Sequence, residues 1–192
     1  MTSSIESSET FQIPLEAAEA YEEAFVPAFF SQWAPVLCDA AGVIAGQKVL
    51  DVACGTGIVA RTAADVVGAP NVVGVDINEA MLTVARRVRP DIDWRQGDAG
   101  VLPFPDLAFD AVLSQMALMF FPERAAALRE MGRVAMAGGT VAVLVPNALD
   151  VQPAYGPLVD MAARHAGAQA RSLLSTYFAC GDLDELRSLF AS

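Results

Sequence analysis

Residues 49–57 read VLDVACGTG, and this short stretch decides the class of fold. Its first half is an apolar run ending in small residues, which is typical of a strand buried inside a parallel sheet. Gly55 and Gly57 permit a tight turn with left-handed backbone and let a ligand approach the main chain closely. A helical pattern follows from Ile58 to Val67, and the free N–H groups at its start can bind an anionic group. The stretch therefore predicts a strand, a glycine turn and a helix that together form a ligand site.

Strands and helices continue to alternate on the C-terminal side of this unit. Short apolar or alternating runs predict four further strands, at residues 71–76, 92–96, 109–114 and 140–145. Two helical patterns lie between them, at residues 78–88 and 122–134, and Asn78 is placed to cap the first. Such alternation predicts an α/β fold, a Rossmann-like doubly wound parallel sheet of about five strands flanked by helices.

The regions on either side of this core have a different character. Residues 1–14 are rich in Ser and Glu, and we expect a flexible N-terminus there. Residues 15–45 have a helical pattern in which aromatic side chains recur every four residues and so share one face. This aromatic stripe, which serves either as core or as a lid over a ligand, consists of Tyr21, Phe25, Phe29 and Trp33. Residues 148–192 look helical, so the chain from residue 15 to 192 is expected to be one domain.

Composition excludes several classes of protein. The chain has 192 residues, 54% hydrophobic and 18% charged, which fits one globular domain with a real core. A net charge of −11 disfavours nucleic acid as a partner. Apolar runs are too short to span a membrane and the first residues do not resemble a signal peptide, so we expect no membrane insertion and a cytoplasmic protein. Three cysteines without metal-ligand spacing predict free thiols and no metal site.

Acidic residues follow the second and third predicted strands. Asp76 ends the second strand, where a carboxylate can accept hydrogen bonds from both hydroxyls of a ribose. Asp98 follows the third strand and can accept from the amino group of an adenine. The loose pattern G-x-G-x-x-A formed with Ala60 is shared with NAD enzymes, but those enzymes have no standing need for a carboxylate after the third strand.

With these segments in view, the chain resembles the class I S-adenosylmethionine-dependent methyltransferases, and within them the small-molecule branch that includes the ubiquinone/menaquinone C-methyltransferases. The segments that carry the resemblance are VLDVACGTG (49–57), GVDINEAML (74–82), GDAGVLPFPDLAFDAV (97–112), SQMALMFFPER (114–124) and LREMGRVAMAGGTVAVLVPN (128–147). The resemblance implies transfer of a methyl group from S-adenosylmethionine to a small-molecule acceptor by in-line displacement, with S-adenosylhomocysteine as product. It also implies that residues 15–45 form a lid and residues 46–147 the cofactor-binding core.

The resemblance further implies roles around the methionine end of the cofactor. The turn would cradle the methionine moiety with the backbone of Ala53, Cys54, Gly55 and Gly57. Asp51 would lie beneath this turn and help to position the cofactor. Gln115, after the fourth strand, would contact the cofactor near its methionine end, and Tyr21 would reach the methionine carboxylate from the lid.

Other residues would bind the adenosine end. Asp76 would bind the ribose diol, and Ile77 and Met81 would pack against the adenine. Asp98 would accept from the adenine amino group, and the N–H of Ala99 would donate to a ring nitrogen. No catalytic acid or base is assigned. Four apolar residues after the fourth strand serve either as an acceptor pocket or as packing, namely Met116, Met119, Phe120 and Phe121.

One departure from the family concerns the end of the chain. Family members of this type have seven strands in the order 3-2-1-4-5-7-6, whereas this chain ends where the sixth would be expected. We therefore expect the final two strands to be missing and residues 140–145 to form an exposed apolar edge. Either the chain is a truncated form, or a homodimer covers this edge.

Two other functions stay open. The first is a non-catalytic module for S-adenosylmethionine binding or for interaction. The second is an NAD(P)-binding oxidoreductase, which the missing Tyr-x-x-x-Lys pair disfavours because Lys48 is the sole lysine.

Overall fold

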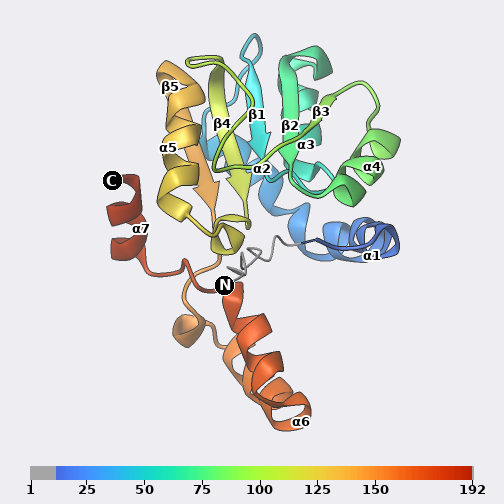
Figure 1. Ribbon diagram of the computed structural model, residues 1–192, viewed down its shortest axis with the longest axis vertical. Coiled ribbons are helices and arrows are strands. Elements are labelled where there is room, and N and C mark those ends of the chain that lie inside the picture. The colour runs from blue at the N-terminus through green and yellow to red at the C-terminus, as the bar shows by residue number, and fades with distance from the viewer. Residues whose placement is uncertain (1–11, 192) are drawn as a thin grey trace, which may run out of the picture.

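A computed structural model describes residues 12–191 of the chain, and its centre is a parallel sheet of five strands. The strand order is β3-β2-β1-β4-β5, which confirms the predicted fold class (Figure 1). The strands are β1 (Val49–Val52), β2 (Val72–Asp76), β3 (Asp93–Gln96), β4 (Phe109–Gln115) and β5 (Ala135–Leu144). Of the flexible segment expected at residues 1–14, residues 1–11 lie outside the described part of the chain.

Helices cover both faces of the sheet, as the doubly wound pattern predicts. The longer ones are α1 (Leu15–Ala20), the π-helix η1 (Tyr21–Phe30), α2 (Trp33–Ala40), α3 (Ile58–Val67), α4 (Glu79–Val88), α5 (Arg124–Val134), α6 (Tyr155–Thr176) and α7 (Leu183–Phe190). Three short 3-10 helices complete the set, η2 (Ala69–Asn71), η3 (Leu118–Phe120) and η4 (Leu149–Val151).

Two large apolar clusters, one on each face of the sheet, form most of the core, and a smaller third cluster joins α1 to α4. Val49 packs into the cluster beneath α2 and α3, whereas Leu50 and Val52 pack into the cluster beneath α5. Neighbouring residues of a strand point to opposite faces, so a strand covered on both sides must be apolar at nearly every position. The unbroken apolar run in the sequence is explained by this double coverage.

The N-terminal helices differ from the prediction. Residues 21–30 form a π-helix with Pro27 inside it. Proline has no N–H to donate, and its ring excludes the carbonyl of the preceding turn, so the regular α-helical ladder is interrupted here. The expected stripe at four-residue spacing is therefore wrong: Phe25 is 61% exposed, whereas Val26 and Phe30 are buried.

Strand β5 begins five residues earlier than predicted and contains an irregularity. Phe109 lies opposite Ala135, but Ala111 lies opposite Thr140, so the register shifts between the two pairs. Gly139 lies within this shift, where a Cβ atom would come 2.8 Å from the carbonyl oxygen of Asp110. Among residues 12–191, β5 has a strand neighbour on one side only. A homodimer that would cover this edge stays a prediction.

Helix α6 projects from the body of the molecule as an arm (Figure 1). Gly167 has non-helical backbone angles inside it, so two helical segments meet at a kink, and Arg171 pairs with Asp160 across that kink. The segments that precede and follow the arm come together where Gly181 packs directly on the backbone of Ala148. No helix in the described part of the chain is both long enough and apolar enough to cross a membrane.

Candidate functional site

The candidate site is a cavity at the carboxyl ends of β1, β2 and β4, on the side of the sheet that faces α1, η1 and the base of α6 (Figure 1). Ligands of open α/β sheets bind at this edge, where the strand order reverses. All the residues predicted to bind the cofactor line this cavity except Gly57. They are Tyr21, Asp51, Ala53, Cys54, Gly55, Asp76, Ile77, Met81, Asp98, Ala99 and Gln115.

The turn between β1 and α3 exposes its backbone to the cavity. Ala53 and Gly55 both have positive φ, 55° and 56°, so the turn contains a left-handed position that is not glycine. Such positions cost free energy and are concentrated at functional sites. A Cβ atom at Gly55 would lie 4.0 Å from Cε1 of Tyr21, which places the tyrosine ring over the turn. The lid helix and the turn therefore form opposite walls of one end of the cavity.

Gly57 does not line the cavity, and its surroundings show a packing role. It precedes α3 with φ +90°, and a Cβ atom there would lie 2.8 Å from Cζ3 of Trp94 and closer still to Cη2. Gly74, in β2, packs on the same ring. Trp94 is buried and its Nε1 donates to the carbonyl oxygen of Arg89 at 2.8 Å. Gly57 thus permits packing of Trp94 behind the turn, and its contact with a cofactor stays a prediction.

Two carboxyl groups lie at the end of β1 and β2. Asp51 is 1% exposed and its Oδ2 accepts from the N–H of Ala60 at 2.9 Å. Burial raises the pKa of Asp51 to about 8, a rise that the Ala60 N–H opposes and the nearby Asp76 carboxylate reinforces. Burial also raises the pKa of Asp76, although its oxygens accept from the N–H groups of Gly55 and Asn78, both at 2.8 Å. A cationic ligand would favour the ionised form of both groups.

The other end of the cavity suits a purine base. Ile77 and Met81 provide apolar walls after β2, and Gly97, Asp98 and Ala99 line the cavity after β3. Oδ1 of Asp98 accepts from the N–H of Gly100 at 2.8 Å, whereas Oδ2 accepts no hydrogen bond from the described residues of the loop. A carboxylate oxygen beside two apolar side chains is the arrangement that the amino edge of an adenine requires.

Gln115 and Met116 close the cavity at the end of β4. Nε2 of Gln115 donates to the carbonyl oxygen of Phe30 at 3.1 Å, which joins the lid to the sheet. Its Oε1 is buried and has no hydrogen-bond partner among the described residues. A buried acceptor without a partner costs free energy, so a donor from a ligand would satisfy it. Met116 has φ +51°, a second left-handed position beside the cavity.

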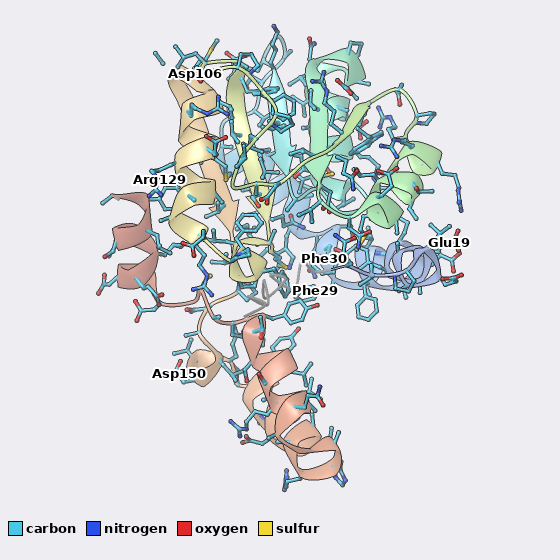
Figure 2. All side chains as sticks on the ribbon, in the orientation of Figure 1. Glu19, Phe29, Phe30, Asp106, Arg129 and Asp150 are labelled. Carbon is cyan, nitrogen blue, oxygen red and sulfur yellow. The ribbon has the colours of Figure 1, made fainter. Side chains whose placement is uncertain are left out.

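An apolar wall adjoins this end of the cavity. Met116, Phe120 and Phe121 line it, whereas Met119 packs into the core instead. Sequence reasoning missed two aromatic residues of this wall, Phe30 from η1 and Tyr177 from the end of α6. Figure 2 shows Phe30 below the sheet, near the base of the arm. The ring of Phe120 meets that of Tyr177 edge-on, with centroids 5.1 Å apart.

A further contact fixes the lid. Glu22, one residue after Tyr21, accepts from Nη1 of Arg61 on α3 at 2.7 Å, and both side chains are largely buried. The pair holds Tyr21 over the glycine turn. The described residues include no group of three acidic, histidine or cysteine side chains that could hold a metal ion.

The residues present fit S-adenosylmethionine. Asp76 and Asp98 match a ribose and an adenine, and the unpartnered Oε1 of Gln115 matches the ammonium group of the methionine end. The carboxyl groups of Asp51 and Asp76 match a ligand with positive charge. Each polar part of the cofactor therefore has a chemical partner in the cavity.

Comparison with known proteins agrees with this geometry. Residues 50–143 match the family described as a methyltransferase domain. A demethylmenaquinone methyltransferase of Renibacterium salmoninarum is 43% identical over 126 residues, covering 66% of this chain and 51% of that protein. The ubiquinone/menaquinone biosynthesis C-methyltransferase UbiE of Photorhabdus laumondii is 38% identical over 133 residues, with the same coverage of 66% and 51%. The chain spans about half the length of the curated relatives it matches.

Among solved structures, an S-adenosylmethionine-dependent methyltransferase of Mesorhizobium loti is 29% identical with a TM-score of 0.53. The match covers 59% of this chain and 52% of that one. The family match, the relatives and the strand order agree with the resemblance carried by the sequence motifs. Residues 50–143 thus match a methyltransferase domain, and the chain is similar to class I S-adenosylmethionine-dependent methyltransferases, among them the ubiquinone/menaquinone C-methyltransferases.

Proposed function

We propose that the protein binds S-adenosylmethionine and transfers its methyl group to a small-molecule acceptor, releasing S-adenosylhomocysteine. One observation carries this proposal: a single cavity joins Asp76, Asp98 and the unpartnered Oε1 of Gln115 to an apolar aromatic wall. The polar part fits the cofactor and the apolar part fits an acceptor beside it. The methyltransferase family match and the curated relatives support the same activity.

The residues of this chain would bind and orient the two reactants. Asp76 holds the ribose and at the same time the N–H of Gly55, so it fixes the cofactor against the turn. Gln115 and Tyr21 line the cavity, and we assign them to the methionine end of the cofactor. When bound, S-adenosylmethionine supplies an electrophilic methyl group on a sulfonium ion. The displacement requires a nucleophile in line with that methyl group, and orientation with exclusion of water lowers the barrier.

The acceptor is proposed to be an apolar aromatic molecule. The wall of Phe30, Phe120 and Tyr177 favours a flat apolar ring, and the relatives named above are quinone methyltransferases by their names. No histidine, lysine or arginine is among the described residues that line the cavity. Burial raises the pKa of Tyr21 and makes its phenol a poor base at neutral pH. An electron-rich acceptor such as a reduced, demethylated quinone needs the least help from the protein.

Methyl transfer is tested with S-adenosylmethionine carrying a labelled methyl group and a panel of reduced demethylated quinones and phenols. We expect label in the organic product and an equal amount of S-adenosylhomocysteine. Asp76→Ala is expected to abolish both. Binding of the cofactor without label transfer to any acceptor would contradict the proposal and favour a non-catalytic binding module.

A further inference from the structure

The loop between β3 and β4 carries the two predicted adenine contacts, Asp98 and Ala99, and has little regular structure of its own. Residues 97–108 contain one isolated bridge, between Asp98 and Val101. A loop without a ladder of backbone hydrogen bonds needs side-chain partners to keep one conformation. The adenine contacts therefore depend on whatever fixes residues 97–108 against the rest of the protein.

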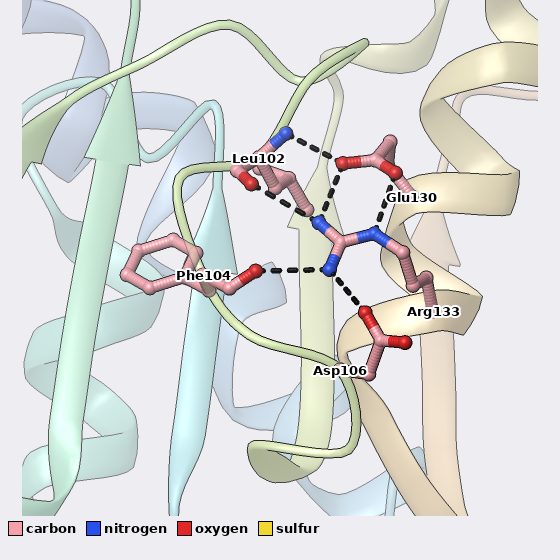
Figure 3. A network of polar contacts seen from close by, with 5 residues as sticks. All are labelled: Leu102, Phe104, Asp106, Glu130 and Arg133. Atoms are coloured by element: carbon pink, nitrogen blue, oxygen red, sulfur yellow. Dashed lines mark hydrogen bonds and ion pairs between the residues drawn. The ribbon is translucent and has the colours of Figure 1, made fainter.

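Backbone hydrogen bonds hold the two ends of the loop, from Gly97 to Asp76 and from Leu107 and Ala108 to the end of α5. The side chain of Arg133, near the end of α5, fixes the stretch between them (Figure 3). Its Nη2 donates to the carbonyl oxygen of Leu102 at 3.1 Å, and its Nη1 donates to that of Phe104 at 2.9 Å. Nη1 also donates to Oδ1 of Asp106 at 2.7 Å. One side chain thus contacts the loop at three points, and two of them are backbone carbonyl oxygens. Only the planar guanidinium group of arginine can donate to both carbonyl oxygens and to a carboxylate at once.

Glu130 holds the guanidinium group in place and touches the loop itself. Its Oε1 accepts from Nε of Arg133 and its Oε2 accepts from Nη2, both at 2.7 Å. Oε2 also accepts from the N–H of Leu102 at 2.7 Å. The hydrogen bond from Arg133 lowers the pKa of Glu130, so the carboxylate stays ionised. All five N–H donors of the guanidinium group thereby have an acceptor, which fixes the orientation of the group.

The anchor at Leu102 is transmitted to Asp98 through a short rigid path. Leu102 and Phe104 are buried in the core, so the polar anchor and the apolar anchor fix the same stretch of loop. The N–H of Val101 donates to the carbonyl oxygen of Asp98 at 3.1 Å, which closes the turn between them. Oδ1 of Asp98 accepts from Gly100, so this carboxylate has one oxygen held by the turn and one free to meet a ligand.

We propose that Arg133, together with Glu130, is a positioning residue that sets Asp98 in the cavity and so determines the preference for adenine over other purine bases. The inference rests on the proposed cofactor. It assigns a role in base recognition to two residues outside the cavity, because neither Arg133 nor Glu130 lines it.

The test compares S-adenosylhomocysteine with S-inosylhomocysteine, in which a carbonyl oxygen replaces the adenine amino group. Affinities for the full chain and its variants are measured by calorimetric titration. The wild-type protein is expected to bind S-adenosylhomocysteine more tightly by about tenfold or more. The adenine amino group donates a charge-assisted hydrogen bond to Asp98, and the carbonyl oxygen of hypoxanthine cannot donate one. Asp98→Ala should remove this preference and serves as the benchmark.

Arg133→Met is expected to reduce the preference to within about threefold, since a loosely held carboxylate no longer distinguishes the two bases. Arg89→Met is the matched control: Arg89 is 29% exposed against 31% for Arg133 and also pairs with two carboxylates, but these belong to Asp65 and Asp91, outside the loop. This control should keep the wild-type preference. General destabilisation of the fold would lower the affinity for both ligands equally and leave the ratio of the two affinities unchanged.

Glu130→Gln keeps the shape of the side chain and covers the case in which Arg133→Met fails to fold. It should lower the ratio in the same direction. An unchanged ratio in both variants, or in Glu130→Gln when Arg133→Met does not fold, overturns the inference. If the wild-type protein binds neither ligand, the proposed cofactor itself is wrong, and the two failures are thereby distinguished.

Discussion

Replacement of Gly57 by alanine should destabilise the protein far more than the same replacement at Gly55, although both glycines belong to one turn. The two positions share positive φ, +90° at Gly57 and +56° at Gly55. Their surroundings differ, because a Cβ atom at Gly57 would lie inside contact distance of Trp94, whereas at Gly55 the nearest atom is 4.0 Å away on Tyr21.

The magnitude follows from two costs. A left-handed backbone costs an alanine about 1–2 kcal/mol at either position. At Gly57 the methyl group must also displace the buried ring of Trp94, and overpacking of a core costs about 1–3 kcal/mol more. The free energy of unfolding should therefore fall by about 2–5 kcal/mol in Gly57→Ala and by about 1–2 kcal/mol in Gly55→Ala.

Urea denaturation of both variants measures this difference. A double-mutant cycle with Trp94→Leu isolates the clash, because the smaller side chain leaves room for the methyl group. The cost of Gly57→Ala should shrink by about 1–3 kcal/mol in that background. Equal destabilisation by the two glycine substitutions, or an unchanged cost of Gly57→Ala beside leucine, would refute the packing role assigned to Gly57.

Three further predictions concern the walls of the cavity. The pKa of Asp51 is about 8 in the folded protein, whereas the ordinary value is 3.8. Between pH 3.8 and 8 the carboxyl group is therefore protonated in the folded state and ionised in the unfolded state. Stability should fall as pH rises through this window, by up to about 1.4 kcal/mol per pH unit, and Asp51→Asn should flatten this dependence in urea denaturation between pH 5 and 8; an unchanged profile would contradict burial as the cause. Glu22→Gln leaves Arg61 largely buried without its carboxylate and should lower stability by about 1–2 kcal/mol in thermal unfolding, with Glu23→Gln, an exposed neighbour, unchanged. Ala53→Gly relieves a left-handed residue and should raise stability by up to about 1 kcal/mol after the added entropy of the unfolded chain, so a clear loss would argue against strain at this position.

Local patterns predicted the part of the site that lies along the strands. The apolar run before Gly55 and the position of Asp76 after a second run required a parallel sheet, whose geometry brings strand ends together. The predicted cap Asn78 is likewise local, and its side chain accepts from the first N–H groups of α4. Fold class and the polar wall of the cavity therefore followed from short segments.

Contacts between distant segments were not predictable in this way. Trp94 packs behind Gly57 from another strand, and no pattern within either segment signals the contact. Tyr177 reaches the cavity from the base of the arm, and it is far in sequence from the other aromatic residues of the wall. The exposure of Phe25 and the burial of Phe30 depend on the π-helical geometry around Pro27, which the spacing of the aromatic residues does not indicate.

The most direct test of the account is a calorimetric titration of the purified chain with S-adenosylmethionine, S-adenosylhomocysteine and NAD. The account predicts binding of the first two, no binding of NAD, and loss of binding in Asp76→Ala and Asp98→Ala. Binding of NAD, or of neither adenosyl compound, would contradict it.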